Sequence, residues 1–210
     1  MTLRKYFLSD QSASSARVLS CSGNDGAYRI ILRETLFHPQ GGGQPADQGW
    51  IADARIQHVT QEQDVIIHHA ETPVTPGNVE TRIDEVLRHL HSRLHSAGHL
   101  IGNLGALLGW RPIKANHAQD KASVTFKAGD HAQTLDETAL QERLHGLVRQ
   151  NLPRQVVVDA DGFRTIGFGG LQPFPCGGTH VTSTGEIGEI VLRGIKHSKG
   201  STTIAYDVRA

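Results

Sequence analysis

The sequence has little cysteine and no long hydrophobic run, and each absence excludes a class of protein. Only two cysteines, Cys21 and Cys176, occur among the 210 residues, and their local contexts differ. A disulfide framework is therefore not expected, and we expect the protein to reside in the reducing cytoplasm. The longest apolar runs, such as Ile30 to Leu32, fall far short of the ~20 residues that a membrane-spanning helix requires. The start, MTLRKYFLSD, shows no signal-peptide pattern, so we expect a cytoplasmic protein that does not enter a membrane.

Net charge is also absent, because 21 basic residues balance 21 acidic ones. There is no broad electrostatic attraction toward nucleic acid or an anionic membrane, so a nucleic-acid partner must be held by a local patch. Basic side chains for such a patch occur in two stretches: Arg111, Lys114, Lys121 and Lys127, and then Arg193, Lys196 and Lys199. Histidine, in contrast, is abundant, and the 13 histidines raise the expectation of metal chemistry.

Two parts of the chain differ in pattern, and we expect one domain over residues 1–80 and a second over residues 81–210. In the first, AYRIILRET, GWIADARIQHV and DVIIHHAE combine β-branched residues with turn residues and lack helical periodicity. The cluster PVTPGN, residues 73–78, suits a linker or a tight loop. The second part combines helices with strand-like segments such as ASVTFKAG and EIVLRGI, which is typical of an α+β domain with an antiparallel sheet.

A long helix opens the second part. Asp84 suits the N-cap position, and apolar residues recur at steps of three and four as far as Leu108, before Gly109 ends the pattern. A second helix is predicted after a capping box at residues 134–137. Three glycines lie inside the long helix: Gly98, Gly102 and Gly105. Each costs ~1 kcal/mol relative to alanine at an exposed interior position, so we expect a backbone, a loop or a substrate to approach that face closely.

Two pairs of residues that commonly bind metals lie far apart in the sequence. His95 and His99 are one turn apart on the predicted helix, so both side chains project from one face, about 5 to 6 Å apart at Cβ. Cys176 and His180 are also four residues apart, with intervening glycines that allow a tight loop. Together the pairs supply three nitrogens and one sulfur, which suits zinc better than hard cations. An HxxxH pair alone is common on helices, so the prediction depends on its combination with CxxxH.

The same helix excludes one large class of zinc enzyme. In metalloproteases the residue after the first histidine of HxxxH is a glutamate that acts as general base, and here that residue is Ser96. The general base of a metalloprotease is therefore missing. A zinc ion at these residues either stabilises the fold or serves a different reaction.

Residues 34–51, ETLFHPQGGGQPADQGWI, contain three consecutive glycines. Such a loop exposes backbone N–H groups and allows positive φ, so it is able to bind an anion or an acyl oxygen. It is not a P-loop, because Gly-Lys-Ser/Thr is absent, and it lacks the GxGxxG spacing of a dinucleotide site. A plain glycine-rich turn is the alternative. Gln44 adds an amide to the loop, and Thr35 adds a hydroxyl.

Three motifs thus follow one another along the chain: HPQGGGQPADQG, HSAGH and CGGTHVTSTGEIG. In this order they resemble the editing domain of alanyl-tRNA synthetase and its freestanding relatives, the AlaX-type trans-editing proteins, over Arg29 to Ala210. The resemblance implies a β-barrel-like N-terminal domain and an α+β editing domain whose long zinc-binding helix packs on an antiparallel sheet. It also implies one zinc ion per chain at the junction, and hydrolysis of the ester that joins a wrong amino acid to tRNA.

The resemblance assigns roles residue by residue. The zinc ligands are the two pairs described above: His95, His99, Cys176 and His180. Gln44 takes the position of the active-site glutamine, as a catalytic residue that positions water or the ester. Contacts with the substrate are expected from five further residues: Thr35, Gly42, Gly43, Gly177 and Thr179. Two departures concern the tRNA contacts, since His38 stands where the family commonly has tyrosine, and Leu87 precedes Arg88 where it has an arginine pair.

The expected partner is mischarged tRNA(Ala), chiefly Ser-tRNA(Ala), with Gly-tRNA(Ala) as a secondary substrate. Alanine is smaller than serine, so size cannot reject it, whereas a site that hydrogen-bonds the serine hydroxyl can. The ester requires a positioned water and a stabilised oxyanion, but no covalent nucleophile. Zinc either activates that water or holds the α-amino group of the substrate, and the sequence leaves both roles open.

Two other functions stay open. The editing domain of threonyl-tRNA synthetase, which would act on Ser-tRNA(Thr), shares the HxxxH and CxxxH pairs but not the GGGQP loop. A noncatalytic, zinc-stabilised module that binds tRNA or protein would use the same four ligands, because four protein ligands are typical of a structural site. We expect a monomer that does not bind ATP in the manner of an aminoacylation enzyme, because the chain leaves no room for a class II aminoacylation domain.

Overall fold

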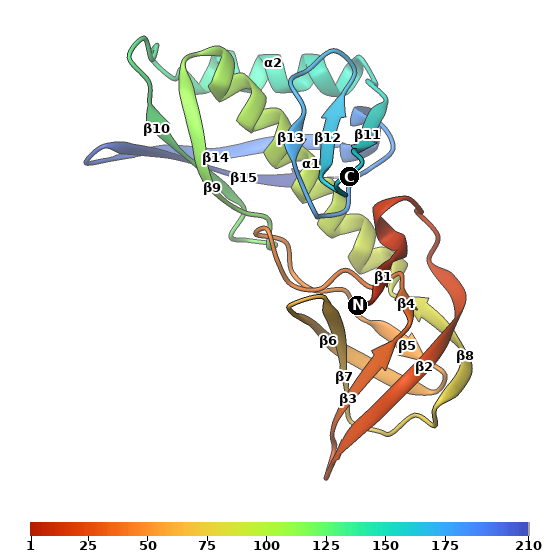
Figure 1. The fold of residues 1–210 in the computed structure, drawn as a ribbon. Coiled ribbons are helices and arrows are strands. Elements are labelled where there is room, and N and C mark those ends of the chain that lie inside the picture. The colour runs from red at the N-terminus through yellow and green to blue at the C-terminus, as the bar shows by residue number, and fades with distance from the viewer. Residues whose placement is uncertain (210) are drawn as a thin grey trace. The chain divides into compact units, whose positions relative to one another are not determined.

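The computed structural model describes residues 1–209, which divide into two compact units (Figure 1). The first unit comprises residues 1–41 and 45–89, and the second comprises residues 42–44 and the chain from Leu90 onward. The division therefore follows His89, whereas the sequence analysis placed a boundary after residue 80. The difference arises because strand β8 (Gly77–Ile83) is part of the first unit, so residues 73–78 do not link two domains.

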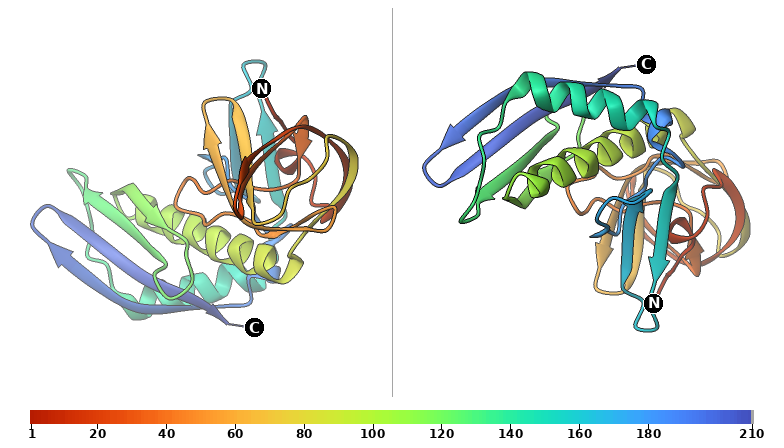
Figure 2. Two further views of the ribbon diagram at one scale, coloured as in Figure 1. Left: turned by 90° about the horizontal axis from the view of Figure 1, so that it is seen from below. Right: turned by 90° about the horizontal axis from the view of Figure 1, so that it is seen from above.

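The first unit is built around a closed barrel of six strands in the order β2-β3-β7-β6-β5-β8. The other five strands are β2 (Ala13–Asn24), β3 (Ala27–Leu32), β5 (Gly49–Ile51), β6 (Ala54–Glu62) and β7 (Val65–Ala70). Buried residues such as Ile30 and Leu32 alternate with more exposed ones, because successive side chains of a strand point to opposite faces. The left view of Figure 2 shows these strands, red to yellow, as a ring. Strands β1 (Leu3–Arg4) and β4 (Glu34–Thr35) form a short parallel pair, and η1 (Lys5–Phe7) is a single 3-10 turn.

The second unit is α+β, as the sequence predicted. A four-stranded antiparallel sheet has the order β14-β15-β10-β9. Its strands are β9 (Trp110–Asn116), β10 (Ser123–Ala128), β14 (Glu189–Ser198) and β15 (Ser201–Arg209). Helices α1 (Glu85–Leu107) and α2 (Glu137–Arg149) share one hydrophobic core with this sheet (Figure 2). A smaller sheet joins β11 (Arg154–Val158), β12 (Arg164–Phe168) and β13 (Phe174–Pro175), and η2 (Thr184–Ile187) is a 3-10 turn.

The two helices differ in how closely their observed N-termini match the predicted ones. The N-cap of α1 is confirmed, because the backbone N–H of Leu87 donates to the Asp84 carboxylate at 3.1 Å. The second helix begins later than the predicted capping box implied. Its N-cap is Asp136, whose side chain accepts from Ala139 N at 2.7 Å, and not Thr134. Strand β9 was not predicted from the sequence, because none of its residues is fully buried and they lack a clear hydrophobic alternation.

The glycines of α1 allow other side chains to approach the helix. A Cβ atom at Gly98 would collide with the His117 ring and the Tyr206 hydroxyl, and one at Gly105 would collide with the Phe126 ring. Gly102 makes only an ordinary contact, with Phe174 at 3.6 Å from its notional Cβ. A close approach to the helix therefore occurs at Gly98 and Gly105, but side chains make it, and not the backbone, loop or substrate that was expected.

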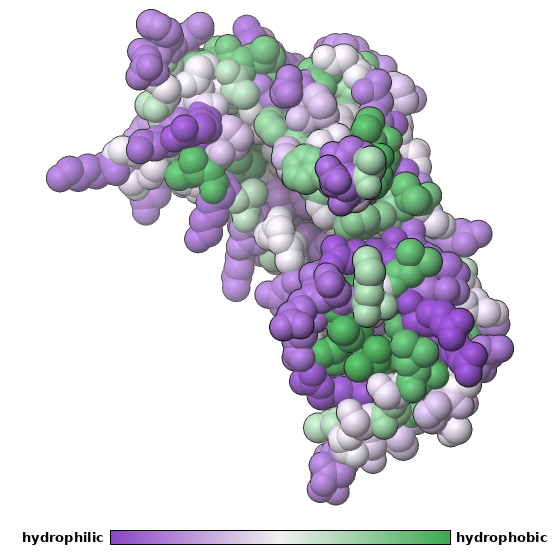
Figure 3. All heavy atoms as spheres, in the orientation of Figure 1, coloured by the Kyte–Doolittle hydropathy of each residue, from purple (hydrophilic) through white to green (hydrophobic). Residues whose placement is uncertain are grey.

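Hydrophilic residues cover much of the face drawn in Figure 3, with smaller apolar areas between them. The side chains of both predicted basic stretches are exposed and come from the four-stranded sheet and its connecting turns. Arg193 is ion-paired with Asp207, so its charge is partly neutralised. Among residues 1–209, no helix combines the length and the apolar character that crossing a membrane requires.

Candidate metal centre

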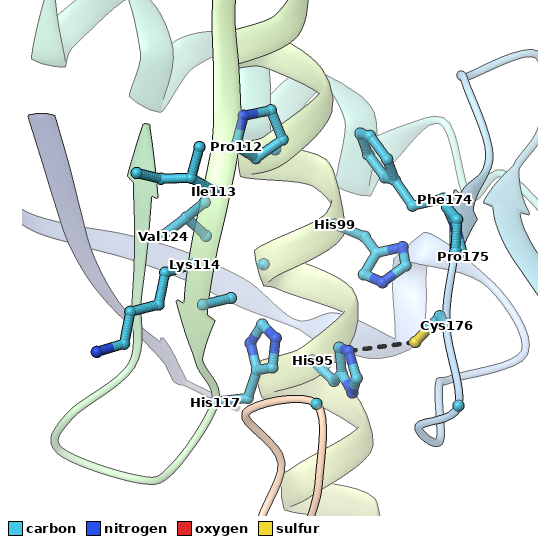
Figure 4. A pocket seen from close by; sticks show the side chains of 15 residues that line it. His95, His99, Pro112, Ile113, Lys114, His117, Val124, Phe174, Pro175 and Cys176 are labelled. Carbon is cyan, nitrogen blue, oxygen red and sulfur yellow. Dashed lines mark hydrogen bonds between the residues drawn. The ribbon is translucent and has the colours of Figure 1, made fainter. Parts of the chain in front are cut away.

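The two predicted ligand pairs meet in the second unit. His95 and His99 lie on α1, and Cys176 and His180 lie in the segment between β13 and η2. Each residue offers one ligand atom, and these four atoms lie within 4.8 Å of one another. Cys176 Sγ is 3.4 Å from His95 Nε2 and 3.2 Å from His180 Nε2. Figure 4 shows His95 and His99 projecting from the helix toward Cys176.

This donor set fits a zinc ion. Tetrahedral zinc with ordinary Zn–N and Zn–S bonds holds neighbouring donor atoms roughly 3.3 to 3.6 Å apart, close to the two sulfur–nitrogen distances observed. His99 Nδ1 is buried without a hydrogen-bond partner in the part of the chain that the structure describes. Burial lowers the pKa of His99 to about 3, and the pKa of His180 lies well below its usual value. Both imidazoles are therefore neutral near pH 7, which is the form that binds metal ions.

Gln44 orients His95. Its Oε1 lies 2.7 Å from His95 Nδ1, and because a carbonyl oxygen only accepts, Nδ1 carries the proton and Nε2 is left with its lone pair. Oε1 also accepts from Thr179 N at 3.0 Å, and Gln44 Nε2 donates to Thr179 Oγ1 at 2.9 Å. The Gln44 side chain is 1% exposed. Gln44 thus reaches the cluster through His95, and its expected role in positioning water or the ester stays a prediction.

Two serines of α1 hold the loop that carries the second ligand pair. Ser96 Oγ lies 3.2 Å from His180 Nδ1 and accepts from Val181 N at 3.2 Å. Ser92 Oγ lies 2.8 Å from Thr179 Oγ1. The residue that replaces the metalloprotease glutamate therefore directs His180 Nε2 toward Cys176. Hydrogen bonds of this kind fix the ring orientation of metal-binding histidines.

Two arginines that the sequence analysis did not select also hold this loop. Arg164 Nη1 donates to the carbonyl oxygens of Cys176 and Gly178 at 2.8 and 2.9 Å, and Arg154 Nη1 donates to that of His180 at 2.7 Å. Gly178 is required for close packing, since a Cβ there would collide with the His95 ring. Burial raises the pKa of the Cys176 thiol, while the Gly178 N–H and the Arg164 charge act in the opposite direction. The Arg164 charge thus partly offsets the effect of burial on the thiolate, which is the form that binds a metal ion.

A cavity of about 310 Å³ adjoins the cluster. His95, His99 and Cys176 form one part of its wall, and Gly42 and Gly177 also line it (Figure 4). Two other residues expected to contact substrate, Gly43 and Thr179, form hydrogen bonds with residues around the cluster. Gly43 has φ of +81°, and its carbonyl oxygen accepts from the backbone N–H of His117 at 2.8 Å. Thr179 is engaged by Gln44 and Ser92, as described above.

The structure adds His117 to the cavity wall. It follows β9, and its ring stacks on that of His95 with centroids 4.0 Å apart. Its Nδ1 lies 2.7 Å from the hydroxyl of Tyr206 on β15. No local motif marks His117, because its position depends on how β9 and β15 pair with β10. A surplus of histidine was the only available signal in the sequence.

Thr35 lies in the first unit and is buried. His68 Nδ1 donates to the Ile30 carbonyl oxygen at 3.1 Å, so its Nε2 accepts from the Thr35 hydroxyl at 2.8 Å. The Thr35 oxygen in turn accepts from Phe37 N at 3.0 Å. The hydroxyl proton is therefore committed to His68, and Thr35 retains one lone pair for another donor.

Comparison with known proteins agrees with this geometry. The family described as "Threonyl and Alanyl tRNA synthetase second additional domain" matches residues 164–203, which include Cys176 and His180. The alanine–tRNA ligase of Haloquadratum walsbyi is 29% identical over 218 aligned residues, covering 90% of this chain and 24% of the ligase. The alanyl-tRNA editing proteins Aarsd1 of Rattus norvegicus and Mus musculus are 27% identical over 218 residues, covering 90% of this chain and 50% of theirs.

The resemblance to alanyl-tRNA editing proteins is confirmed. This chain spans about half the length of those editing proteins and about a quarter of the ligase. Because the aligned region covers 90% of the chain, the resemblance to alanyl-tRNA editing proteins includes both units and is not limited to the family match at residues 164–203.

The first unit should lose stability in acid through His68. Burial lowers the pKa of His68 from 6.5 to about 4. Between these values the unfolded chain binds more protons than the folded chain, so stability falls as the pH falls. The contribution of neutral His68 to the free energy of unfolding is fully present above pH 6.5. It is lost as the pH falls to about 4, and the total loss is about 3 kcal/mol. Urea unfolding from pH 7 to 4 should show a smaller decline for His68→Gln than for wild type, and parallel declines would contradict the assignment.

Proposed function

We propose that this chain deacylates mischarged tRNA(Ala), chiefly Ser-tRNA(Ala) with Gly-tRNA(Ala) as a secondary substrate. The observation that carries the proposal is the convergence of His95, His99, Cys176 and His180 beside a cavity. The named activity of the Aarsd1 relatives, alanyl-tRNA editing, supports the same reaction. One zinc ion per chain would be held by these four residues.

In ester hydrolysis the residues of the chain would orient the metal ligands and leave space for the substrate. When bound, zinc supplies Lewis-acid stabilisation of developing negative charge. Gln44 and Ser96 hold the rings of His95 and His180 in one orientation, so the ligands need not reorganise during the reaction. Gly42 and Gly177 line the cavity without side chains, and no atom lies within 4 Å of a notional Cβ at either. They leave room for the acyl group and the terminal ribose.

Discrimination against alanine would depend on polar groups that meet the serine hydroxyl. A site with such groups leaves them unpaired when alanine binds, which costs more than a missing methylene does. Thr35 is proposed to supply one of them. Because its own proton is committed to His68, Thr35 has one lone pair left as an acceptor, and an acceptor is what a serine O–H requires.

Lys114 connects the cavity with the basic surface. It belongs to the exposed basic stretch Arg111, Lys114, Lys121 and Lys127 and also lines the cavity. A cation at the mouth of an ester-hydrolysing site suits the phosphate nearest the acylated end of tRNA. Because the net charge of the chain is zero, local contacts of this kind would have to guide the tRNA.

Two alternatives are distinguished by experiment. Action on Ser-tRNA(Thr) is compatible with the family match, whose description includes threonyl-tRNA synthetase. A noncatalytic zinc-stabilised module is compatible with four protein ligands, which normally make a closed site. The cavity beside Cys176 favours catalysis, because a purely structural site does not require space for a substrate.

Zinc should be present at one equivalent per chain after gentle purification. The double variant Cys176→Ala/His180→Ala should lose it, because half of the donor set is removed. Elemental analysis after dialysis against a weak chelator measures the content. Cys21→Ser is the matched control, since Cys21 is the other cysteine and lies on β2 of the first unit. Full zinc retention by the double variant, or zinc loss from the control, would contradict the ligand assignment.

Gln44→Ala should weaken zinc binding by ~10- to 100-fold, because His95 loses the acceptor that fixes its tautomer. Gln44→Glu should retain the affinity, since a carboxylate also accepts from His95 Nδ1. Chelator competition measures both values, with melting temperature as a control for folding. If Gln44→Ala kept full zinc affinity but deacylated ~10² to 10³-fold more slowly, a direct catalytic role of Gln44 would be supported instead.

Purified zinc-loaded protein should hydrolyse Ser-tRNA(Ala) faster than Ala-tRNA(Ala) by up to ~10⁴-fold, because alanine would leave the proposed acceptor of the serine hydroxyl unpaired. Release of labelled amino acid from Ser-, Gly- and Ala-tRNA(Ala) measures this, and the Cys176→Ala/His180→Ala variant provides the background rate. Equal rates on the seryl and alanyl esters would exclude hydroxyl recognition. Faster cleavage of Ser-tRNA(Thr) would favour the first alternative, and no cleavage by the zinc-loaded protein would favour the second.

A further inference from the structure

His117 is held in a single tautomer. The Tyr206 hydroxyl donates to the Leu94 carbonyl oxygen at 2.9 Å, and this oxygen can only accept. The Tyr206 oxygen must therefore act as the acceptor in its 2.7 Å contact with His117 Nδ1. It follows that Nδ1 carries the imidazole proton and Nε2 carries the lone pair.

The orientation of the His117 ring is fixed as well. The ring stacks on His95 at an interplanar angle of 20°. It occupies the space above Gly98, where a Cβ atom would collide with it. Its backbone N–H is bonded to the carbonyl oxygen of Gly43. His117 is 3% exposed and Tyr206 1%, so both side chains are confined by their neighbours.

Outside the His/Cys cluster, His117 Nε2 is the side-chain hydrogen-bond acceptor in the described cavity wall. His117 lines the cavity, and among the described residues its ring makes its hydrogen bond through Nδ1, not through Nε2. The other lining side chains outside the cluster are apolar, except Lys114, which is only a donor. No carboxylate lies in the described cavity wall. Once a metal ion occupies the cluster, His117 is the side chain left in this wall to accept a hydrogen bond.

An aminoacyl ester carries a group that requires such an acceptor. Its α-amino group has N–H donors in both its charged and its neutral form, and burying a donor without a partner is unfavourable. We propose that His117 Nε2 accepts a hydrogen bond from the α-amino group of the aminoacyl ester, so that His117 is a substrate-binding residue. This inference rests on the proposed deacylase function. It assigns the amino group to the protein, so a metal ion held by the four cluster residues would not be needed to bind it.

Binding of nonhydrolysable analogues tests this directly. Two amide-linked 3′-aminoadenosine derivatives are compared on the zinc-loaded protein by calorimetry, one carrying a seryl group and the other a 3-hydroxypropionyl group without the α-amino group. Wild type should bind the seryl analogue ~10- to 10²-fold more tightly, the range for a hydrogen bond to a charged group. His117→Phe, which keeps an aromatic ring against His95, should abolish that difference while binding the second analogue as wild type does.

Two further variants separate the acceptor from the packing. His117→Gln restores an amide oxygen and should recover part of the preference. Tyr206→Phe removes the group that fixes the tautomer and should reduce the preference. Zinc content and melting temperature monitor the fold of each variant. An equal affinity loss of His117→Phe for both analogues, or an unchanged preference, would overturn the proposal.

The tautomer has its own measurement. The ¹⁵N spectrum of histidine-labelled protein should show His117 protonated at Nδ1 and unprotonated at Nε2, and the reverse assignment would overturn the proposal without any substrate. Deacylation by wild type is assayed separately. Failure of wild type to cleave Ser-tRNA(Ala) would count against the proposed function, whereas cleavage with unchanged analogue preference in His117→Phe would count against His117 alone.

Discussion

The hydrogen bond between His95 Nδ1 and Gln44 Oε1 is the interaction on which the rest of the site depends. It fixes the ring orientation of one histidine of the cluster. Through Thr179, the same amide also holds the loop that carries Cys176 and His180. Residues from three separate motifs are thereby connected by one side chain. This explains why residues 42–44 are part of the second unit, although the sequence around them belongs to the first.

Close packing around glycine makes this arrangement possible. Gly98 admits His117 and Tyr206 to the surface of α1, and Gly178 admits the His95 ring beside the ligand loop. Gly43 approaches the backbone of β9, where a Cβ would meet the Ala115 carbonyl oxygen at 2.5 Å. At these positions glycine brings the elements together. The loop glycines Gly41, Gly42 and Gly43 are nevertheless exposed, as expected, and Gly42 lines the cavity.

Local patterns were sufficient to predict α1 and the two ligand pairs, because helix periodicity and a four-residue spacing are properties of short segments. The partners of those ligands could not be predicted in the same way. Arg154 and Arg164 reach the ligand loop through the antiparallel pairing of β11 with β12, and a strand register cannot be read from one sequence. Gln44 was selected from its motif, but its partner His95 becomes evident only from the fold.

The two stacked histidines illustrate how the fold gives different roles to equal side chains. In both, an oxygen acceptor holds the proton on Nδ1: Gln44 Oε1 for His95, and the Tyr206 hydroxyl oxygen for His117. The lone pair of each is then left on Nε2. For His95 that atom lies 3.4 Å from Cys176 Sγ, so it belongs to the His/Cys cluster. His117 Nε2 has no such neighbour and is left for a donor from outside the protein. Position alone, set by α1 and by the pairing of distant strands, places one imidazole in the His/Cys cluster and the other in the cavity wall beside it.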